Sequence, residues 1–144
     1  MKGNIKKLSD IKLKKVIEKD MDFLYQLLEG RKINENISHR KMPSLIEHRK
    51  FVLSKPYEKW YIIIFEGRKI GSIYLSKINE IGLHLQKDFQ KNEIRNKIIN
   101  KLIAKNPKKR YLVNINPKNK SLIKFFQSKK FKKIQHTYEL IKKE

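Results

Sequence analysis

The stretch that decides the fold is "IGLHLQKDFQKNEIRNKIINKLI", Ile81–Ile103. It begins as an apolar run of β type, continues through a short polar connection, and ends with apolar residues at helical spacing. A strand that leads directly into a helix aims backbone N–H groups and the positive end of the helix dipole at one place, which suits a phosphate. Loops of this kind usually carry glycines, whereas this one has Glu93 and Arg95. The stretch alone leaves open whether it is a phosphate site.

The residues before this stretch predict two helices and three further strands. Residues 11–18 alternate apolar and charged side chains, which indicates a half-exposed strand. Asp20 is placed to cap a helix that Gly30 ends, and Ser44 with Glu47 has capping-box spacing before a second helix. Within residues 60–86, the runs "WYIIIF", "KIGSIYLS" and "EIGLHLQ" are separated by "EGR" and "KIN", which predicts antiparallel hairpins.

The residues that follow complete the predicted architecture. The helix that begins after the polar connection ends at Asn106-Pro107, and "RYLVNIN" then reads as a short buried strand. A helix is predicted over "NKSLIKFFQSKK" and a last strand over "FKKIQHTYELI". The order β-α-α-β-β-β-α-β-α-β predicts an α/β (α+β) protein with a mixed, mostly antiparallel central sheet flanked by helices. Its length predicts a single domain over residues 1–144.

Composition excludes several classes of protein. The chain has no cysteine, so it has neither disulfides nor thiolate chemistry. No apolar run approaches the roughly 18 residues of a membrane span, and the first residues lack the apolar core of a signal peptide. We therefore expect a cytoplasmic protein with no membrane partner. The four histidines are not at metal-ligand spacing, so no metal site is predicted.

The charge of the chain is strongly positive. Its formal net charge is +22, and every charged side chain between Glu93 and Glu139 is Lys or Arg. Such a field attracts anions, either nucleic acid or a phosphate-rich small ligand. A lysine-rich composition that reflects only AT-rich codons explains the charge equally well, so nucleic acid stays a less favoured partner class.

The stretch "NEIGLHLQKDFQKNEIRNKIINKLI", followed by "YLVNINPKNKSLIKFFQSKKF", resembles the GNAT family of acyl-CoA-dependent N-acetyltransferases over nearly the whole chain. In that family the fourth strand leads into a loop of pattern Gln/Arg-x-x-Gly-x-Gly/Ala, whose backbone amides hold the pyrophosphate of acetyl-CoA. Gln90 matches the first position, while Glu93 and Arg95 fall on the small positions. In the family's second signature Asn119 and the pair Phe125-Phe126 match, and Lys130-Phe131 replace Gly-Phe.

The resemblance also implies roles for individual residues. Glu80 matches the glutamate that, in several branches of the family, deprotonates the acceptor amine, and Phe126 stands where many members have a Tyr that protonates the leaving thiolate. The implied acceptor-site residues are His39, Arg40 and Asn114. The implied acetyl-CoA contacts are Leu83, Leu85, Gln90, Lys91, Asn92, Glu93, Ile94, Arg95, Asn96, Asn119 and Phe126.

The function that the resemblance implies is transfer of acetyl from acetyl-CoA to a primary amine of a small molecule or protein, by a monomer or homodimer. At the loop, Glu93 adds repulsion toward a pyrophosphate, while Lys91 and Arg95 add attraction. If Glu93 must take a positive φ, that conformation costs about 1 kcal/mol. The alternative is a degenerate GNAT scaffold that acts as a non-catalytic binding protein, for example for nucleic acid.

Overall fold

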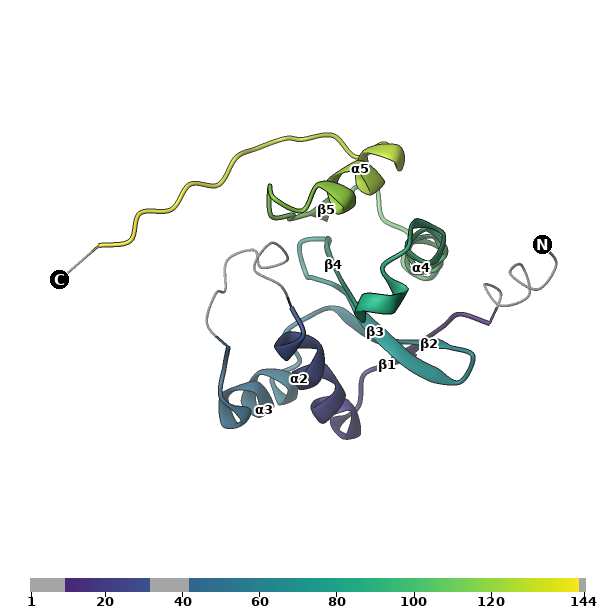
Figure 1. The fold of residues 1–144 in the computed structure, drawn as a ribbon, viewed down its shortest axis with the longest axis vertical. Coiled ribbons are helices and arrows are strands. Elements are labelled where there is room, and N and C mark those ends of the chain that lie inside the picture. The colour runs from purple at the N-terminus through teal and green to yellow at the C-terminus, as the bar shows by residue number, and fades with distance from the viewer. Residues whose placement is uncertain (1–9, 32–41, 143–144) are drawn as a thin grey trace.

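The computed structural model describes residues 10–31 and 42–142, and a five-stranded sheet lies at its centre (Figure 1). The strand order is β1-β2-β3-β4-β5. The pairs from β1 to β4 are antiparallel, and β4 pairs with β5 in parallel, which confirms the predicted mixed, mostly antiparallel sheet. The strands are β1 Lys12–Lys15, β2 Lys59–Phe65, β3 Arg68–Leu75, β4 Glu80–Leu85 and β5 Leu112–Val113.

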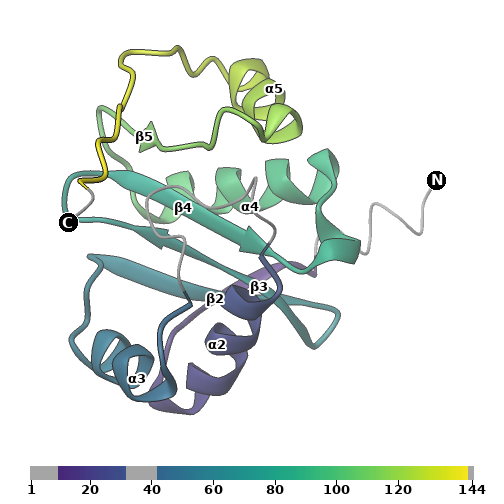
Figure 2. The ribbon, with the colours of Figure 1, turned by 60° about the vertical axis from the view of Figure 1, so that its left-hand side comes forward.

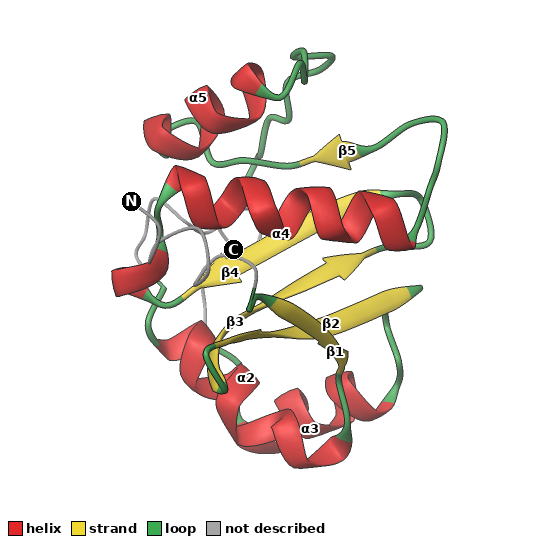
Figure 3. Cartoon of the chain, turned by 90° about the vertical axis from the view of Figure 1, so that its right-hand side faces the viewer, coloured by secondary structure: helices red, strands yellow, loops and turns green. Residues whose placement is uncertain are grey.

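Helices cover both faces of the sheet. Helices α2 (Met21–Glu29) and α3 (Leu45–Leu53) lie on one face, whereas α4 (Asn92–Lys105) lies on the other, with α5 (Lys120–Ser128) beside it (Figures 2 and 3). Two short 3-10 turns, η1 (Glu18–Asp20) and η3 (Lys87–Phe89), precede α2 and α4.

Strand β2 divides the apolar side chains between two cores. Because successive residues of a strand point to opposite faces, Ile62 packs with the α2/α3 layer, and Ile63 packs with the α4/α5 layer. The smaller core joins Ile62 to Leu24, Leu27 and Val52. The larger core includes Ile63, Ile73, Leu75, Ile98, Ile99, Leu102, Phe125 and Phe126.

The two predicted helix starts have different outcomes. The capping box of α3 is confirmed, since Ser44 N donates to Glu47 Oε1 at 3.0 Å and Glu47 N donates to Ser44 Oγ at 3.1 Å. Asp20 does occupy the N-cap position of α2, as predicted, but its carboxylate makes no capping bond to the helix. It is buried and accepts from Ile17 N at 2.9 Å and from Lys69 Nζ at 2.8 Å, so it ties the turn before α2 to β3.

The predicted last strand is wrong. After α5, residues 132–142 run as exposed chain without secondary structure (Figure 1). Ile134, Tyr138 and Leu140 are 61%, 88% and 84% exposed. A strand needs a neighbour to complete its hydrogen bonds, and β5 at the sheet edge offers only Leu112–Val113. The alternation of apolar residues therefore has no ladder to join.

The described residues limit two classes of site. Among the helices that the structure describes, none has the length and apolar character needed to cross a membrane. Within residues 10–31 and 42–142, no three His, Cys, Asp or Glu side chains come together as metal ligands.

Candidate functional site

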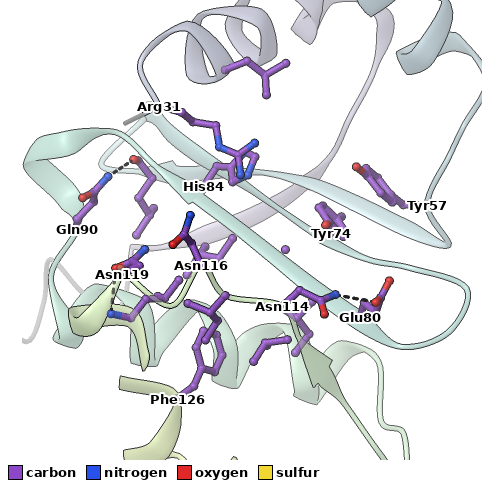
Figure 4. A pocket seen from close by; sticks show the side chains of 18 of the residues that line it. Arg31, Tyr57, Tyr74, Glu80, His84, Gln90, Asn114, Asn116, Asn119 and Phe126 are labelled. Atoms are coloured by element: carbon purple, nitrogen blue, oxygen red, sulfur yellow. Dashed lines mark hydrogen bonds between the residues drawn. The ribbon is translucent and has the colours of Figure 1, made fainter. Parts of the chain in front are cut away.

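The site lies where β4 and β5 part. The two strands pair only at Glu80–Leu112 and Ile81–Val113. Beyond that point β4 continues to Leu85, whereas the chain after Val113 leaves the sheet. A cavity of about 930 Å³ opens between them (Figure 4). The outer edge of β4 from Gly82 to Leu85 therefore presents backbone N–H and C=O groups to the cavity instead of to a strand.

Residues from both layers of helices line this one cavity. Gln90, Arg95, Asn119, Leu122 and Phe126 come from the side of α4 and α5. Arg31, His48, Phe51, Tyr57 and Tyr74 come from the side of α2 and α3 or from the neighbouring sheet face. A ligand that enters from one side can therefore meet one that enters from the other, at the point where the strands part.

Gln90, which matches the first position of the family's loop pattern, holds the connection from β4 to α4 at its start. Gln90 lines the cavity, and its Nε2 donates to Leu85 O at 3.0 Å, so the side chain fixes the end of β4. Lys91 comes directly before α4, and its carbonyl accepts the first helical bond from Arg95 N at 2.9 Å. The N–H groups that precede Arg95 are those that a helix leaves without an intrahelical partner.

Arg95 stands at a position where the loop pattern has a small residue, and its side chain is buried. It is 7% exposed and lines the cavity. Its Nη1 donates to Asn92 Oδ1 at 3.0 Å and to Ser121 Oγ at 3.2 Å, which joins the start of α4 to α5. A positive charge is thus fixed at the α4 end of the cavity.

Glu93 causes no backbone strain. It lies exposed in the first turn of α4 and does not line the cavity. Among the described residues, positive φ outside glycine occurs at Lys55, Glu66, Asn79 and Lys130. None of these lies in the connection to α4, so the conformational cost that a positive φ at Glu93 would carry does not arise.

Glu80 stands at the point where the strands part. Its Oε2 accepts from Asn114 Nδ2 at 2.7 Å, so a side chain of β4 is joined to the residue that follows β5 (Figure 4). Glu80 and Asn114 both line the cavity. The structure thus brings the predicted base and one predicted acceptor residue together.

An aromatic wall lies next to Glu80. Tyr57 and Tyr74 stack with ring centroids 3.8 Å apart and planes 1° apart. Gly82 is paired with Tyr74 across the strands, and a Cβ built on Gly82 would lie 2.0 Å from Tyr74 Cε2. The ring therefore covers the glycine backbone. Burial raises the pKa of both phenols, and the charge of Glu80 also raises that of Tyr74, so both stay protonated at neutral pH.

Farther along β4, His84 has the side chain of Arg31, which follows α2, directed toward it (Figure 4). Burial, followed by the positive charge of Arg31, lowers the pKa of His84 to about 3. The imidazole is therefore neutral at physiological pH, and the charge at this end of the cavity is that of Arg31.

The other predicted site residues divide into four groups. Asn119 and Phe126 line the cavity: Asn119 Oδ1 accepts from Leu122 N at 3.3 Å as the cap of α5, and Phe126 is buried. The side chains of Leu83, Leu85 and Ile94 belong to the larger core. Lys91, Asn92 and Asn96 are exposed and outside the cavity lining, whereas His39 and Arg40 fall outside the described residues.

Sequence reasoning did not identify Arg31, Gly82, His84, Tyr57 or Tyr74 as site residues. A glycine inside a strand often marks the close approach of another group, and Gly82 was such a signal. Arg31 follows Gly30, the C-cap of α2, and no local pattern distinguishes it from other lysines and arginines.

We expect Gly82→Ala to lower the free energy of unfolding by about 1–3 kcal/mol, because the new methyl group displaces Tyr74 from its stack on Tyr57. Urea denaturation followed by Trp60 fluorescence measures the loss of stability. The same signal reports the displaced stack, because the Trp60 ring centroid lies 4.9 Å from that of Tyr57. Gly30→Ala is the control, since a Cβ there meets its nearest atom at 3.6 Å. Equal stability of the two variants would contradict the close packing of Tyr74.

No protein-family model matches the sequence, and no curated protein matches it. Solved structures do match its fold. A domain from Methanocaldococcus jannaschii is 21% identical with a TM-score of 0.71, and the match covers 90% of this chain and 92% of the other. An N-acetyltransferase from Staphylococcus aureus is 17% identical with a TM-score of 0.69, over 85% and 83% of the two chains.

RimL, a ribosomal alpha-N-protein acetyltransferase solved in complex with coenzyme A, is 17% identical with a TM-score of 0.64. That match covers 83% of this chain and 78% of the other. At these identities the likeness concerns the fold. The chain therefore has the GNAT N-acetyltransferase fold.

Proposed function

We propose that the protein is an N-acetyltransferase that moves acetyl from acetyl-CoA to a primary amine. The observation that carries this proposal is the cavity between β4 and β5, which is lined from both sides of the sheet and has Glu80 where the strands part. Similar structures are N-acetyltransferases, and one of them was solved with coenzyme A.

The donor would bind along β4. Pantetheine is an extended chain with two amides, and the outer edge of β4 from Gly82 to Leu85 has N–H and C=O groups spaced to pair with them. The pyrophosphate would lie at the first turn of α4, where the helix dipole and the buried Arg95 supply positive charge. At about 930 Å³, the cavity is large enough for a cofactor-sized ligand.

The reaction requires a base at the acceptor. Glu80 would take a proton from the acceptor ammonium, and the amine nitrogen would then attack the thioester carbonyl carbon. The new C–N bond forms as the C–S bond breaks, the nitrogen releases its second proton to water, and CoA leaves as a thiolate. Phe126 has no proton to donate, so the thiolate takes its proton from water or from another donor. Asn114 would hold the Glu80 carboxylate in place through its 2.7 Å bond.

Calorimetry with CoA and acetyl-CoA at low salt tests the proposal. We expect a saturable binding heat with a micromolar dissociation constant, because the cavity combines an unpaired strand edge with a helix N-terminus. No detectable heat at millimolar ligand, from protein shown to be folded by Trp60 fluorescence, would contradict it. Titration with duplex and single-stranded RNA at about 50 mM salt tests the alternative, which requires RNA affinity that falls steeply with salt.

We expect Glu80→Gln to lower kcat/KM by about 10²–10⁴-fold, because an amide cannot take the ammonium proton. The affinity for CoA should stay unchanged, since the carboxylate would contact the acceptor rather than the donor. Steady-state kinetics and calorimetry on the same variant separate the two effects. Glu58→Gln is the matched control, because it removes the same charge from an ion pair with Lys108. Glu58 does not line the cavity. Full activity of Glu80→Gln would show that another group is the base.

Glu93 offers a test of the loop. If its carboxylate opposes the pyrophosphate, Glu93→Gly should tighten CoA binding at low salt, although glycine costs the helix about 1 kcal/mol. Glu93→Gln removes the same charge without that cost and should bind CoA several-fold more tightly, with a gain that shrinks as salt is added. Calorimetry at two salt concentrations measures this, with Glu66→Gln in the β2–β3 turn as the control. Unchanged or weaker affinity in both Glu93 variants would show that Glu93 does not oppose the ligand.

A further inference from the structure

We propose that the acceptor is a small primary amine that also carries an anionic group, a carboxylate or a phosphate, and that Arg31 binds this group while the amine lies at Glu80. This inference rests on the proposed function and names the substrate class of the same site.

The positions of the two charges along β4 carry the proposal. One face of β4 carries Glu80, Gly82 and His84, because alternate residues of a strand point to the same side. Figure 4 shows the Arg31 side chain directed toward His84. The four residue-to-residue steps of strand from Glu80 to His84 span about 13 Å. A negative and a positive side chain thus border the same cavity, with several residues of β4 between them.

The wall between the two charges favours a compact linker. Tyr74 covers Gly82 and stacks on Tyr57, so the surface between Glu80 and His84 is largely aromatic. Both phenols stay protonated and His84 stays neutral at physiological pH, so none of these three groups adds a formal charge. The middle of the acceptor therefore contacts an uncharged wall. Its two charged groups would be recognised at the two ends of that wall, by Glu80 and by Arg31.

Arg31 can bind a ligand while it keeps protein partners. A guanidinium has five N–H donors in a planar fork, which suits carboxylates and phosphates. Among residues 10–31 and 42–142, the other charged side chains that line this half of the cavity are Glu47 and Glu80. The Glu47 carboxylate accepts from Ser44 N in the capping box of α3, which engages it at the helix start. A second ammonium at the Arg31 end would meet like charge, so a diamine should fit less well.

A panel of matched acceptors tests the substrate class. The probes are 4-aminobutyrate and 6-aminohexanoate, their amides, the diamines of equal length, and 3-aminopropyl phosphate, each assayed with acetyl-CoA. We expect kcat/KM for the better amino carboxylate or the amino phosphate to exceed that of the matched amide at least tenfold. The carboxylate and phosphate arms distinguish the two anions. Amides or diamines that react as well as the acids would overturn the inference.

Variants of Arg31 test the assigned residue. Arg31→Gln should remove the preference for acids by raising their KM, while the amides react as before, and Arg31→Lys should keep part of it. Arg49→Gln is the matched control, because Arg49 forms an exposed ion pair with Glu18. An acid preference that survives in folded Arg31→Gln would overturn the role of Arg31, and a thermal melt establishes folding.

Binding separates this inference from the proposed function. If CoA binds but no amine is acetylated, calorimetry of 4-aminobutyrate and 3-aminopropyl phosphate with CoA-loaded protein decides the anion site. If CoA does not bind, the proposed function fails. The same titrations on the protein alone then decide whether Arg31 forms an anion site. In either case, binding that is tenfold weaker in Arg31→Gln supports the site, and equal or absent binding overturns it.

Discussion

The cavity depends on one constraint, the two-position pairing of β4 with β5. If the parallel ladder continued beyond Ile81 and Val113, the outer edge of β4 would be satisfied by β5 and no ligand could lie there. Instead, Asn114 turns its side chain to Glu80, and Asn119 caps α5 a few residues later. The first bond holds the end of β5 at β4, and the second starts α5, so the chain leaves the sheet between them. The strand edge, the carboxylate and the helix α5 are thus placed by the same local event.

The connection to α4 shows how a phosphate loop can lack glycines. Glycine in such loops allows either a positive φ or the close approach of a ligand to the backbone. Here the connection to α4 has no positive φ, so only the close approach is at issue. Arg95 turns its side chain toward Ser121 of α5, which keeps the guanidinium buried and leaves the helix start in place. A bound anion would therefore meet a fixed charge as well as the N–H groups of the first turn.

The periodic parts of the fold could be predicted from sequence, because their signals are local. The capping box before α3, the hairpins β2–β3–β4 and the apolar spacing of α4 each depend on residues within one or two elements. The last strand could not be predicted, since a strand also depends on the length of its neighbour. The same holds for the site: the packing of Tyr74 over Gly82 and the electrostatic effect of Arg31 on His84 join distant segments, and no spacing in the chain encodes them.

The net charge of +22 and the charges inside the cavity act at different ranges. The overall field raises the encounter rate of any anionic ligand and is screened by salt within about 8–10 Å. It cannot distinguish acetyl-CoA from other phosphates, nor one acidic amine from another. Discrimination requires contacts within a few ångströms, which Arg95 can supply at the donor end and Arg31 with Glu80 at the acceptor end. Salt should therefore slow the arrival of ligands while it leaves the order of preference among acceptors largely unchanged.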